Sequence, residues 1–259
     1  MNKNLEYLSP RQRFSYKEGS KLPMVDLTEL MAYTGHTPKE AEQHAANCRI
    51  DLAKEWKKQN PQTPEECSKF YTETEGYLYD LYTWSHDPQM WKLFDEKIKG
   101  DERVLDYGAG IGDISIYLAE RGCDVISVEL PKSHTKRFLM DRVYKRKLGD
   151  KIKFKFDEEK ESFDVVLAID VLEHLHFPLR YVIQLTKLLK SKDSWCFFTP
   201  SFRDDHGVHP MHLEENYWLD KEFGRAMMSL AFKAEFVVDE YYPIWYPLFK
   251  TSPQGAKRL

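Results

Sequence analysis

Three glycines and two acids stand where a nucleotide could be bound. The stretch Asp106-Tyr107-Gly108-Ala109-Gly110-Ile111-Gly112 begins as a short apolar run ends, and Glu129 ends the next apolar run. Glycine lets the backbone turn sharply and lets a ligand approach it closely, because no Cβ intervenes. Glu129 follows Gly110 by about the 20 residues expected of an acid that binds ribose hydroxyls. The pattern predicts a nucleotide site; the alternative is a glycine-rich turn in another kind of α/β protein.

A second group of residues able to do chemistry lies further along the chain. Asp170, Glu173 and His174 follow the apolar run 163–169. The segment after the run 194–199 holds histidines at three-residue intervals, namely His206, His209 and His212. Histidine suits general-base chemistry near neutral pH and also binds metal ions. We expect these side chains near an acceptor or a metal ion.

Alternating strands and helices must position these groups. The run 103–107 predicts a strand, 114–121 a helix closed by Gly122, and 124–129 a second strand. Later segments repeat the pattern: helices at 131–149, 177–189 and 220–230, and strands at 152–156, 163–169, 194–199, 232–239 and 242–249. This order predicts an α/β fold, in which ligands bind beyond the carboxyl ends of parallel strands.

Two motifs resemble those of the class I S-adenosylmethionine (SAM) methyltransferases, in the right order and spacing. They are the glycine stretch with Glu129 and the run from Phe163 to Leu175. The resemblance covers roughly residues 100 to 250. It implies a Rossmann-like sheet of seven strands with the last one reversed, and SAM as the methyl donor. It would place SAM beside these residues: Asp106, Gly108, Ala109, Gly110, Glu129, Leu130, Asp157, Asp170 and Val171.

The glycine spacing also bears on the rival cofactor, NAD. Dinucleotide-binding folds use the spacing G-x-G-x-x-G. Here the glycines alternate as Gly108, Gly110 and Gly112. An NAD-dependent oxidoreductase is therefore disfavoured.

Three interpretations remain open for the acceptor side. In the first, a histidine such as His209 or His212 deprotonates or orients the acceptor, and His174 is a further candidate. In the second, Asp170, Glu173, His174 and a loop histidine hold a divalent metal. That set resembles the E-x-x-E-H arrangement of small-RNA 2′-O-methyltransferases and ubiquinone-pathway O-methyltransferases. In the third, Glu173 and His174 are structural, capping a helix and fastening the loop. We do not expect a metal.

One segment departs from the family pattern. Only residues 157–162 separate the expected third and fourth strands. Parallel strands need a crossover of about a dozen residues or more. We therefore predict that the third strand is short or displaced. Asp157 stands near the position where family members often carry an acid that contacts adenine.

Residues 1–98 lie outside the resemblance. Residues 1–24 predict a polar arm, and a short helix should follow Asp26 and end near Gly35. The sequences Thr37-Pro38-Lys39-Glu40 and Thr63-Pro64-Glu65-Glu66 are helix start signals, with threonine as cap and proline in the first turn. We expect these two helices to end near residues 58 and 84.

Aromatic residues on the second of these helices suggest a lid over a pocket. Tyr71, Leu78 and Tyr82 are spaced to share one helix face, and Tyr71 is the first candidate for a ligand contact. The alternative is that these side chains only pack the helices onto the catalytic core. We divide the chain into 1–98, an arm and helical lid or substrate subdomain, and 99–259, the SAM-binding domain.

Composition restricts the class of protein. The 259 residues are 42% hydrophobic and 14% aromatic, which is enough for a sizeable core. A net charge of −4 does not favour a nucleic-acid partner. Four cysteines without metal-like spacing suggest reduced thiols in a cytoplasmic protein. The polar N-terminus predicts no signal peptide, and no apolar run is long enough for a membrane span.

These observations predict a SAM-dependent methyltransferase that acts on an oxygen or nitrogen of a small-molecule acceptor. Two alternatives remain open. The acceptor could be RNA or protein, or the chain could bind SAM for regulation without turnover. The acceptor and the oligomeric state are not determined by the sequence.

Overall fold

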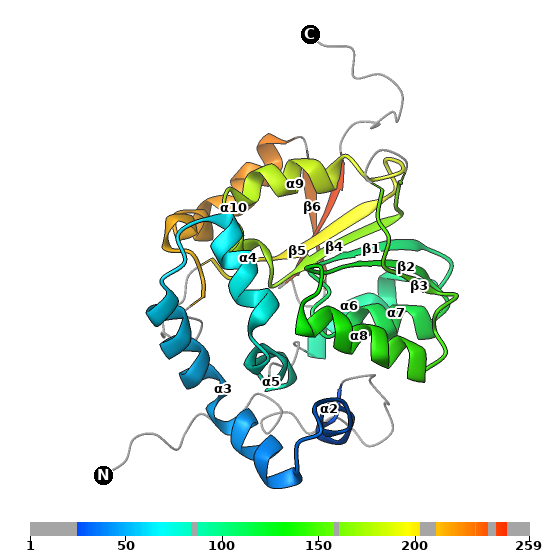
Figure 1. Ribbon diagram of the computed structural model, residues 1–259. Coiled ribbons are helices and arrows are strands. Elements are labelled where there is room, and N and C mark those ends of the chain that lie inside the picture. Colours follow the sequence, from blue (N-terminus) through cyan, green and yellow to red (C-terminus); the bar gives the residue numbers. More distant parts are fainter. Residues whose placement is uncertain are drawn as a thin grey trace.

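Five parallel strands form the centre of the molecule, and an antiparallel pair extends one edge (Figure 1). The computed structural model describes residues 25–83, 88–157, 161–202, 211–230, 232–237 and 242–247. The strand order is β3-β2-β1-β4-β5-β7-β6. The strands are β1 (Arg103–Tyr107), β2 (Asp124–Val128), β3 (Ile152–Lys153), β4 (Val165–Ile169), β5 (Trp195–Thr199), β6 (Phe232–Val237) and β7 (Tyr242–Pro247). The predicted α/β fold with a parallel sheet is confirmed.

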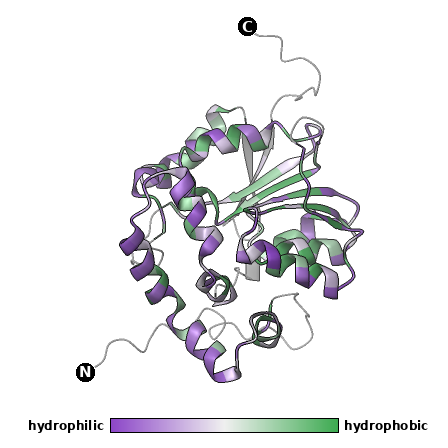
Figure 2. Cartoon of the chain, in the orientation of Figure 1, coloured by the Kyte–Doolittle hydropathy of each residue, from purple (hydrophilic) through white to green (hydrophobic). Residues whose placement is uncertain are grey.

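Helices cover both faces of this sheet. On one face lie α6 (Pro88–Lys97), α7 (Asp113–Glu120) and α8 (His134–Lys145), and on the other α9 (Pro178–Thr186) and α10 (Leu219–Ser229). Neighbouring strand residues point to opposite faces, so Val104 packs in the first core and Leu105 in the second. Both faces are buried, which is why the central strand β4 is apolar at every position (Figure 2).

In the part of the chain that the structure describes, four helices precede this layered unit, and two of them, α4 and α5, lie at the carboxyl ends of its strands (Figure 1). They are α2 (Leu27–Thr34), α3 (Pro38–Gln59), α4 (Pro64–Glu73) and α5 (Gly76–Thr83). The predicted capping boxes are present, since Thr37 and Thr63 each accept a hydrogen bond from the backbone of the glutamate three residues on. Among the described residues, no helix is long and apolar enough to cross a bilayer.

The predicted single helix from Thr63 to Trp84 is wrong. Thr74 is extended, with φ −92° and ψ 101°, so α4 ends there and α5 begins at Gly76. Tyr71 and Leu78 therefore lie on separate helices and pack in different clusters. Trp84 lies outside the described residues. The break matters because it turns both helices toward the ends of the strands.

Two further boundaries differ from the prediction. Helix α8 begins at His134 instead of Pro131, because Lys132 has a left-handed φ of 64° and Ser133 caps the helix by accepting from the Lys136 N–H. Helix α10 begins at Leu219, one residue before the predicted start at residue 220. Helix α6 was not predicted; Trp91 and Phe94 pack it onto the sheet.

The prediction of a short third strand is confirmed. Strand β3 pairs with β2 only through Ile152 and Lys153. The connection to β4 therefore takes up residues 154–164, long enough for a parallel crossover. Phe163, expected to begin the fourth strand, forms an isolated bridge with Leu189 instead.

Candidate functional site

The glycine loop between β1 and α7 forms one wall of a cavity of about 360 Å³. Gly108, Gly110 and Gly112 all have positive φ, at 77°, 55° and 85°. A Cβ on Gly108 would lie 2.5 Å from Val171 Cγ2, closer than atoms can pack. The N–H groups of Gly108 and Ala109 donate to the Val128 carbonyl at 2.9 and 3.0 Å. The loop is thus folded against the ends of β2 and β4, and only glycine fits.

Glu129, at the end of β2, lies beside this loop. One carboxylate oxygen accepts from the Gly110 N–H at 2.7 Å and the other from the Leu130 N–H at 2.8 Å. Burial raises the pKa of Glu129, although these two hydrogen bonds act in the opposite direction. Each oxygen keeps a second lone pair, so the carboxylate can also accept two ligand hydroxyls from the cavity.

Asp106 supplies a second acid to the cavity wall. Its Oδ2 accepts from the Ser115 hydroxyl at 2.5 Å, and that hydroxyl lies 2.6 Å from the hydroxyl of Ser127. Burial raises the pKa of Asp106 to about 6, opposed by the hydrogen bond from Ser115. The hydroxyl chain ties β1, α7 and β2 together behind the glycine loop.

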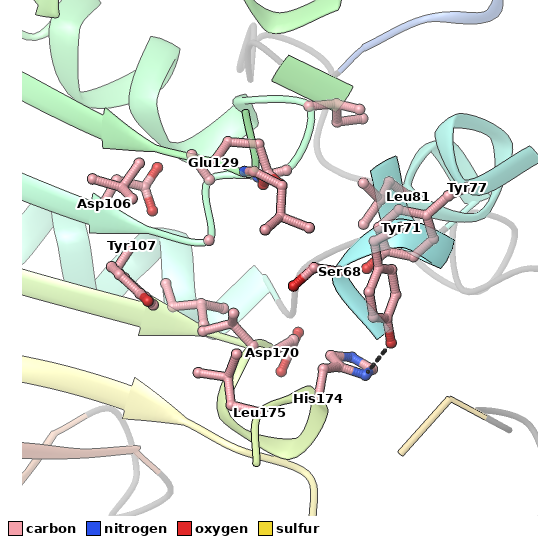
Figure 3. A pocket seen from close by; sticks show the side chains of 18 of the residues that line it. Ser68, Tyr71, Tyr77, Leu81, Asp106, Tyr107, Glu129, Asp170, His174 and Leu175 are labelled. Atoms are coloured by element: carbon pink, nitrogen blue, oxygen red, sulfur yellow. Dashed lines mark hydrogen bonds between the residues drawn. The ribbon is translucent and has the colours of Figure 1, made fainter. Parts of the chain in front are cut away.

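Asp170 stands at the end of β4, across the cavity from Glu129 (Figure 3). Its φ is 50°, a left-handed conformation that few residues other than glycine, asparagine and aspartate adopt readily. Its N–H still pairs with the Thr199 carbonyl at 3.3 Å. Backbone strain of this kind gathers at functional sites.

A buried ion network fastens the glycine loop to α2. Arg142 donates to the Ile111 carbonyl at 2.6 Å and to Asp113 Oδ1 at 2.7 Å. Its Nε also lies 3.2 Å from Glu29 on α2, and the Val25 N–H donates to the same Asp113 oxygen at 3.0 Å. The Arg142 side chain is fully buried. The network therefore joins α2 to the glycine loop through Arg142 of α8.

Helices α4 and α5 close the cavity opposite the glycine loop. Tyr77 and Leu81 come from α5, and a Cβ on Gly110 would lie 3.3 Å from Leu81 Cδ1. Tyr71 comes from α4, and its hydroxyl lies 2.9 Å from His174 Nδ1 (Figure 3). Burial raises the pKa of Tyr71 well above its ordinary value, so the phenol stays protonated. An aromatic wall therefore faces the backbone loop.

His174 belongs to a compact cluster at the edge of the cavity. Its ring meets the ring of His212 edge to face, with centroids 4.9 Å apart. Glu173 is buried; its Oε1 accepts from the Ser201 N–H at 3.1 Å, and its Oε2 has no hydrogen-bond partner among the described residues. Burial, and then Asp170, raises the pKa of Glu173 to about 8. Ligand atoms of Glu173, His174 and His212 lie within 4.8 Å of one another.

The structure brings most of the predicted site residues together. Those that line the cavity are Tyr71, Asp106, Gly108, Ala109, Gly110, Glu129, Leu130, Asp170, Val171 and His174. His212 does not line the cavity but contacts the ring of His174, which does. His209 lies outside the described residues. Asp157 is not a lining residue; it lies in the connection after β3, which ends at Lys153.

Several lining residues were not predicted, among them Cys67, Ser68, Tyr107, His176 and Tyr181. The lining residues of α4 are Pro64, Cys67, Ser68 and Tyr71. Their intervals of three and four residues mark one helix face, a signal that was present in the sequence. Nothing local connects His176 or Tyr181 with that face.

Comparison with known proteins identifies the family. A family model described as a methyltransferase domain matches residues 84–233, more than half of the chain. The ubiquinone biosynthesis O-methyltransferase of Ruegeria sp. (strain TM1040) is 31% identical over 109 residues, which cover 38% of this chain and 43% of that protein. N-methyltransferase 4 of Papaver somniferum is 25% identical over 130 residues, 47% of this chain and 36% of that protein. The matches thus span less than half the length of these curated relatives.

A solved structure gives a similar but more distant match. An O-methyltransferase family protein from Burkholderia thailandensis is 17% identical, with a TM-score of 0.47, over 71% of this chain and 60% of that one. The domain match, the glycine loop and the acid after β2 agree. The chain belongs to the methyltransferase-domain family, the class I methyltransferases that use S-adenosylmethionine as methyl donor.

Proposed function

We propose that this protein transfers the methyl group of SAM to an oxygen or nitrogen of a small-molecule acceptor. The observation that carries the proposal is the cavity between the glycine loop with Glu129 on one side and the aromatic face of α4 and α5 on the other. The first side suits a nucleoside, and the second suits an organic acceptor. The relatives include both an O- and an N-methyltransferase, which supports these two acceptor atoms.

The residues present fit SAM. Gly108 and Gly110 line the cavity and carry no side chain, so the amino-acid part of SAM can approach their backbone. Glu129 would accept from the ribose hydroxyls, Leu130 and Val171 would contact the base, and Asp106 and Asp170 would hold the ammonium group. When bound, SAM supplies a methyl group made electrophilic by the adjacent sulfonium.

The acceptor would lie on the α4 side of the cavity. In this proposal α2 to α5 form the lid and acceptor subdomain. His174, held by the Tyr71 hydroxyl and the Met211 carbonyl, contacts and orients the acceptor. His212 supports His174 from behind, and His209 stays a prediction. Enclosure by α4 and α5 excludes water and brings the acceptor atom into line, which is the main source of rate in such displacements.

A transfer assay with labelled SAM tests this function. Catechol, para-nitrophenol, phenethylamine, a short RNA and a peptide mixture serve as acceptors. We expect transfer to a phenol or an amine. Gly108→Ala should reduce it by about a hundredfold or more, because the new Cβ cannot avoid Val171 at a left-handed φ.

Gly149→Ala is the matched control, since a Cβ there meets nothing within 4 Å. It should transfer at the wild-type rate. Turnover only on RNA or peptide would replace the small-molecule acceptor by a macromolecule. Binding of SAM without turnover on any acceptor would leave a SAM-binding protein that is not an enzyme.

A second candidate, metal-assisted transfer, is favoured by the cluster of Glu173, His174 and His212. The unpartnered, buried Glu173 Oε2 is the observation that supports it. The cluster does not include Asp170, which the sequence interpretation had counted as a ligand. Tyr71 and Met211 engage His174 Nδ1, so only Nε2 of this ring could be a metal ligand.

Calorimetric titration of metal-free protein with Mn²⁺ distinguishes a metal site from a structural role for the cluster of Glu173, His174 and His212. A metal site requires stoichiometric binding that Glu173→Gln and His212→Ala both abolish. Glu214→Gln, on a neighbouring exposed acid, should bind as the wild type does. If no Mn²⁺ binds to the wild type, Glu173 and His174 fasten the loops and the metal hypothesis is withdrawn.

A further inference from the structure

Three side chains from distant segments meet beside the cavity: Cys67 of α4 and His176 after η1 (Leu172–His174), which line it, and Glu215 of η2 (Glu214–Asn216), which contacts His176. We propose that His176 takes the proton from the methyl acceptor and that Glu215 positions it for this role. The inference rests on the proposed function and names the residue that activates the acceptor.

The hydrogen bonds determine which nitrogen of His176 can act. Nδ1 lies 2.8 Å from Glu215 Oε1, and a carboxylate can only accept, so Nδ1 carries the proton. Nε2 is then the basic nitrogen. It lies 3.6 Å from Cys67 Sγ, a long contact in which the thiol donates. Cys67 and His176 both line the cavity, so an acceptor hydroxyl or amine can take the place of the thiol.

Hydrogen bonds between neighbouring segments hold Glu215 beside His176. The Asn216 side chain, which is buried, donates to the Leu175 carbonyl at 2.9 Å, and the Leu213 N–H donates to the Glu173 carbonyl at 3.1 Å. These bonds fasten η2 along the segment 173–175, immediately before His176. Glu215 is therefore presented to the imidazole by its neighbours in the chain.

His176 is better placed than His174 to accept a proton. The His174 ring nitrogen Nδ1 contacts a neutral hydroxyl and a carbonyl, from Tyr71 and Met211. The ring of His176 is backed by a carboxylate, which stabilises the imidazolium that forms on proton uptake. His174 remains the residue that orients the acceptor.

The proposed step balances in charge. The lone pair of the acceptor oxygen or nitrogen forms the new bond to the methyl carbon as the carbon–sulfur bond breaks and leaves its electron pair on sulfur. The acceptor O–H or N–H bond breaks, and its proton passes to His176 Nε2. One positive charge thus leaves the sulfonium and one appears on the imidazolium beside Glu215.

The test uses para-nitrophenol and S-adenosylhomocysteine (SAH), because the phenolate has its own absorption band and SAH cannot transfer a methyl group. In the ternary complex of wild-type protein, SAH and para-nitrophenol, we expect the phenolate to form at a lower pH than in water. His176→Gln should lose about nine-tenths of the band or more at neutral pH. Glu215→Gln should raise the pH midpoint for ionisation of the bound para-nitrophenol by about one pH unit, because His176 without the carboxylate is a weaker base.

Controls separate this proposal from the proposed function. Glu214→Gln, on the same short helix, should match the wild type. Calorimetry measures SAH binding by each variant; no SAH binding by the wild type refutes the proposed function itself. If SAH binds, absence of the phenolate band in the wild type, or an equal band in His176→Gln, overturns the role of His176. Nitrogen NMR that finds the proton on Nε2 in the wild type would overturn it as well.

Discussion

Alanine in place of Glu129 is expected to weaken SAH binding by more than about a hundredfold. The carboxylate accepts from the Gly110 and Leu130 N–H groups, so its loss leaves two donors of the loop unpaired and removes the ribose acceptor. Each lost interaction of this kind costs about 1 to 3 kcal/mol, and 1.4 kcal/mol is tenfold in affinity. Calorimetric titration with SAH measures the effect.

Two further variants make this result specific. Glu129→Gln keeps one acceptor oxygen but turns an amide donor toward a backbone donor. Its affinity for SAH should therefore lie between those of the wild type and Glu129→Ala. Glu120→Ala removes an acid on α7 whose carboxylate lies 3.4 Å from Arg146, far from the lining residues. It should bind SAH as the wild type does. If Glu129→Ala binds SAH within about twofold of the wild type, the acid does not contact the ligand, and NAD binding would point to another cofactor.

Methionine in place of Arg142 is expected to destabilise the protein by about 3 to 5 kcal/mol. The side chain is fully buried and pairs with Asp113 and Glu29 while donating to the Ile111 carbonyl. Methionine fills a similar volume but leaves the buried Asp113 carboxylate without its cation. Urea unfolding in the absence of SAH measures the change. Weaker SAH binding should accompany it, because Ile111 belongs to the glycine loop.

Neutralising Asp113 as well should restore part of the stability lost in Arg142→Met. The double variant Arg142→Met with Asp113→Asn removes both charges, so it should be more stable than Arg142→Met alone. Lys145→Met is the matched control on the same helix, since Lys145 is half-exposed and pairs with Asp141; its effect should stay within about 1 kcal/mol. Equal stabilities of Arg142→Met and Lys145→Met would contradict a structural role for the network.

Local signals were sufficient where short-range chemistry decides the structure. Thr37 and Thr63 begin their helices as predicted, because a capping box is satisfied within four residues. The start of α8 was misplaced, because Pro131 and Ser133 both fit a helix start and the left-handed Lys132 decides between them. The break at Thr74 was missed because the helix was continued through Thr74-Glu75-Gly76, although threonine and glycine are residue types that often mark helix ends.

The candidate site divides in the same way. The half that we propose for SAM comes from the ends of adjacent parallel strands, so Asp106, Glu129 and Asp170 could be predicted from their positions after apolar runs. Among the lining residues on the side that we propose for the acceptor, only Tyr71 and His174 were predicted from the sequence. Cys67, His176 and Glu215 approach one another across long stretches of chain, and no interval in the sequence encodes that distance.

By itself the sequence determined the α/β class, the glycine loop with its acid, and a short third strand. Each follows from backbone conformation or from the period of apolar residues, which neighbouring residues decide. Only the tertiary structure decided how α4 and α5 close the cavity, which histidine is backed by a carboxylate, and that Asp157 is not among the residues that line the cavity. These depend on where whole elements dock, and docking is decided by the sum of many weak contacts that no single motif carries.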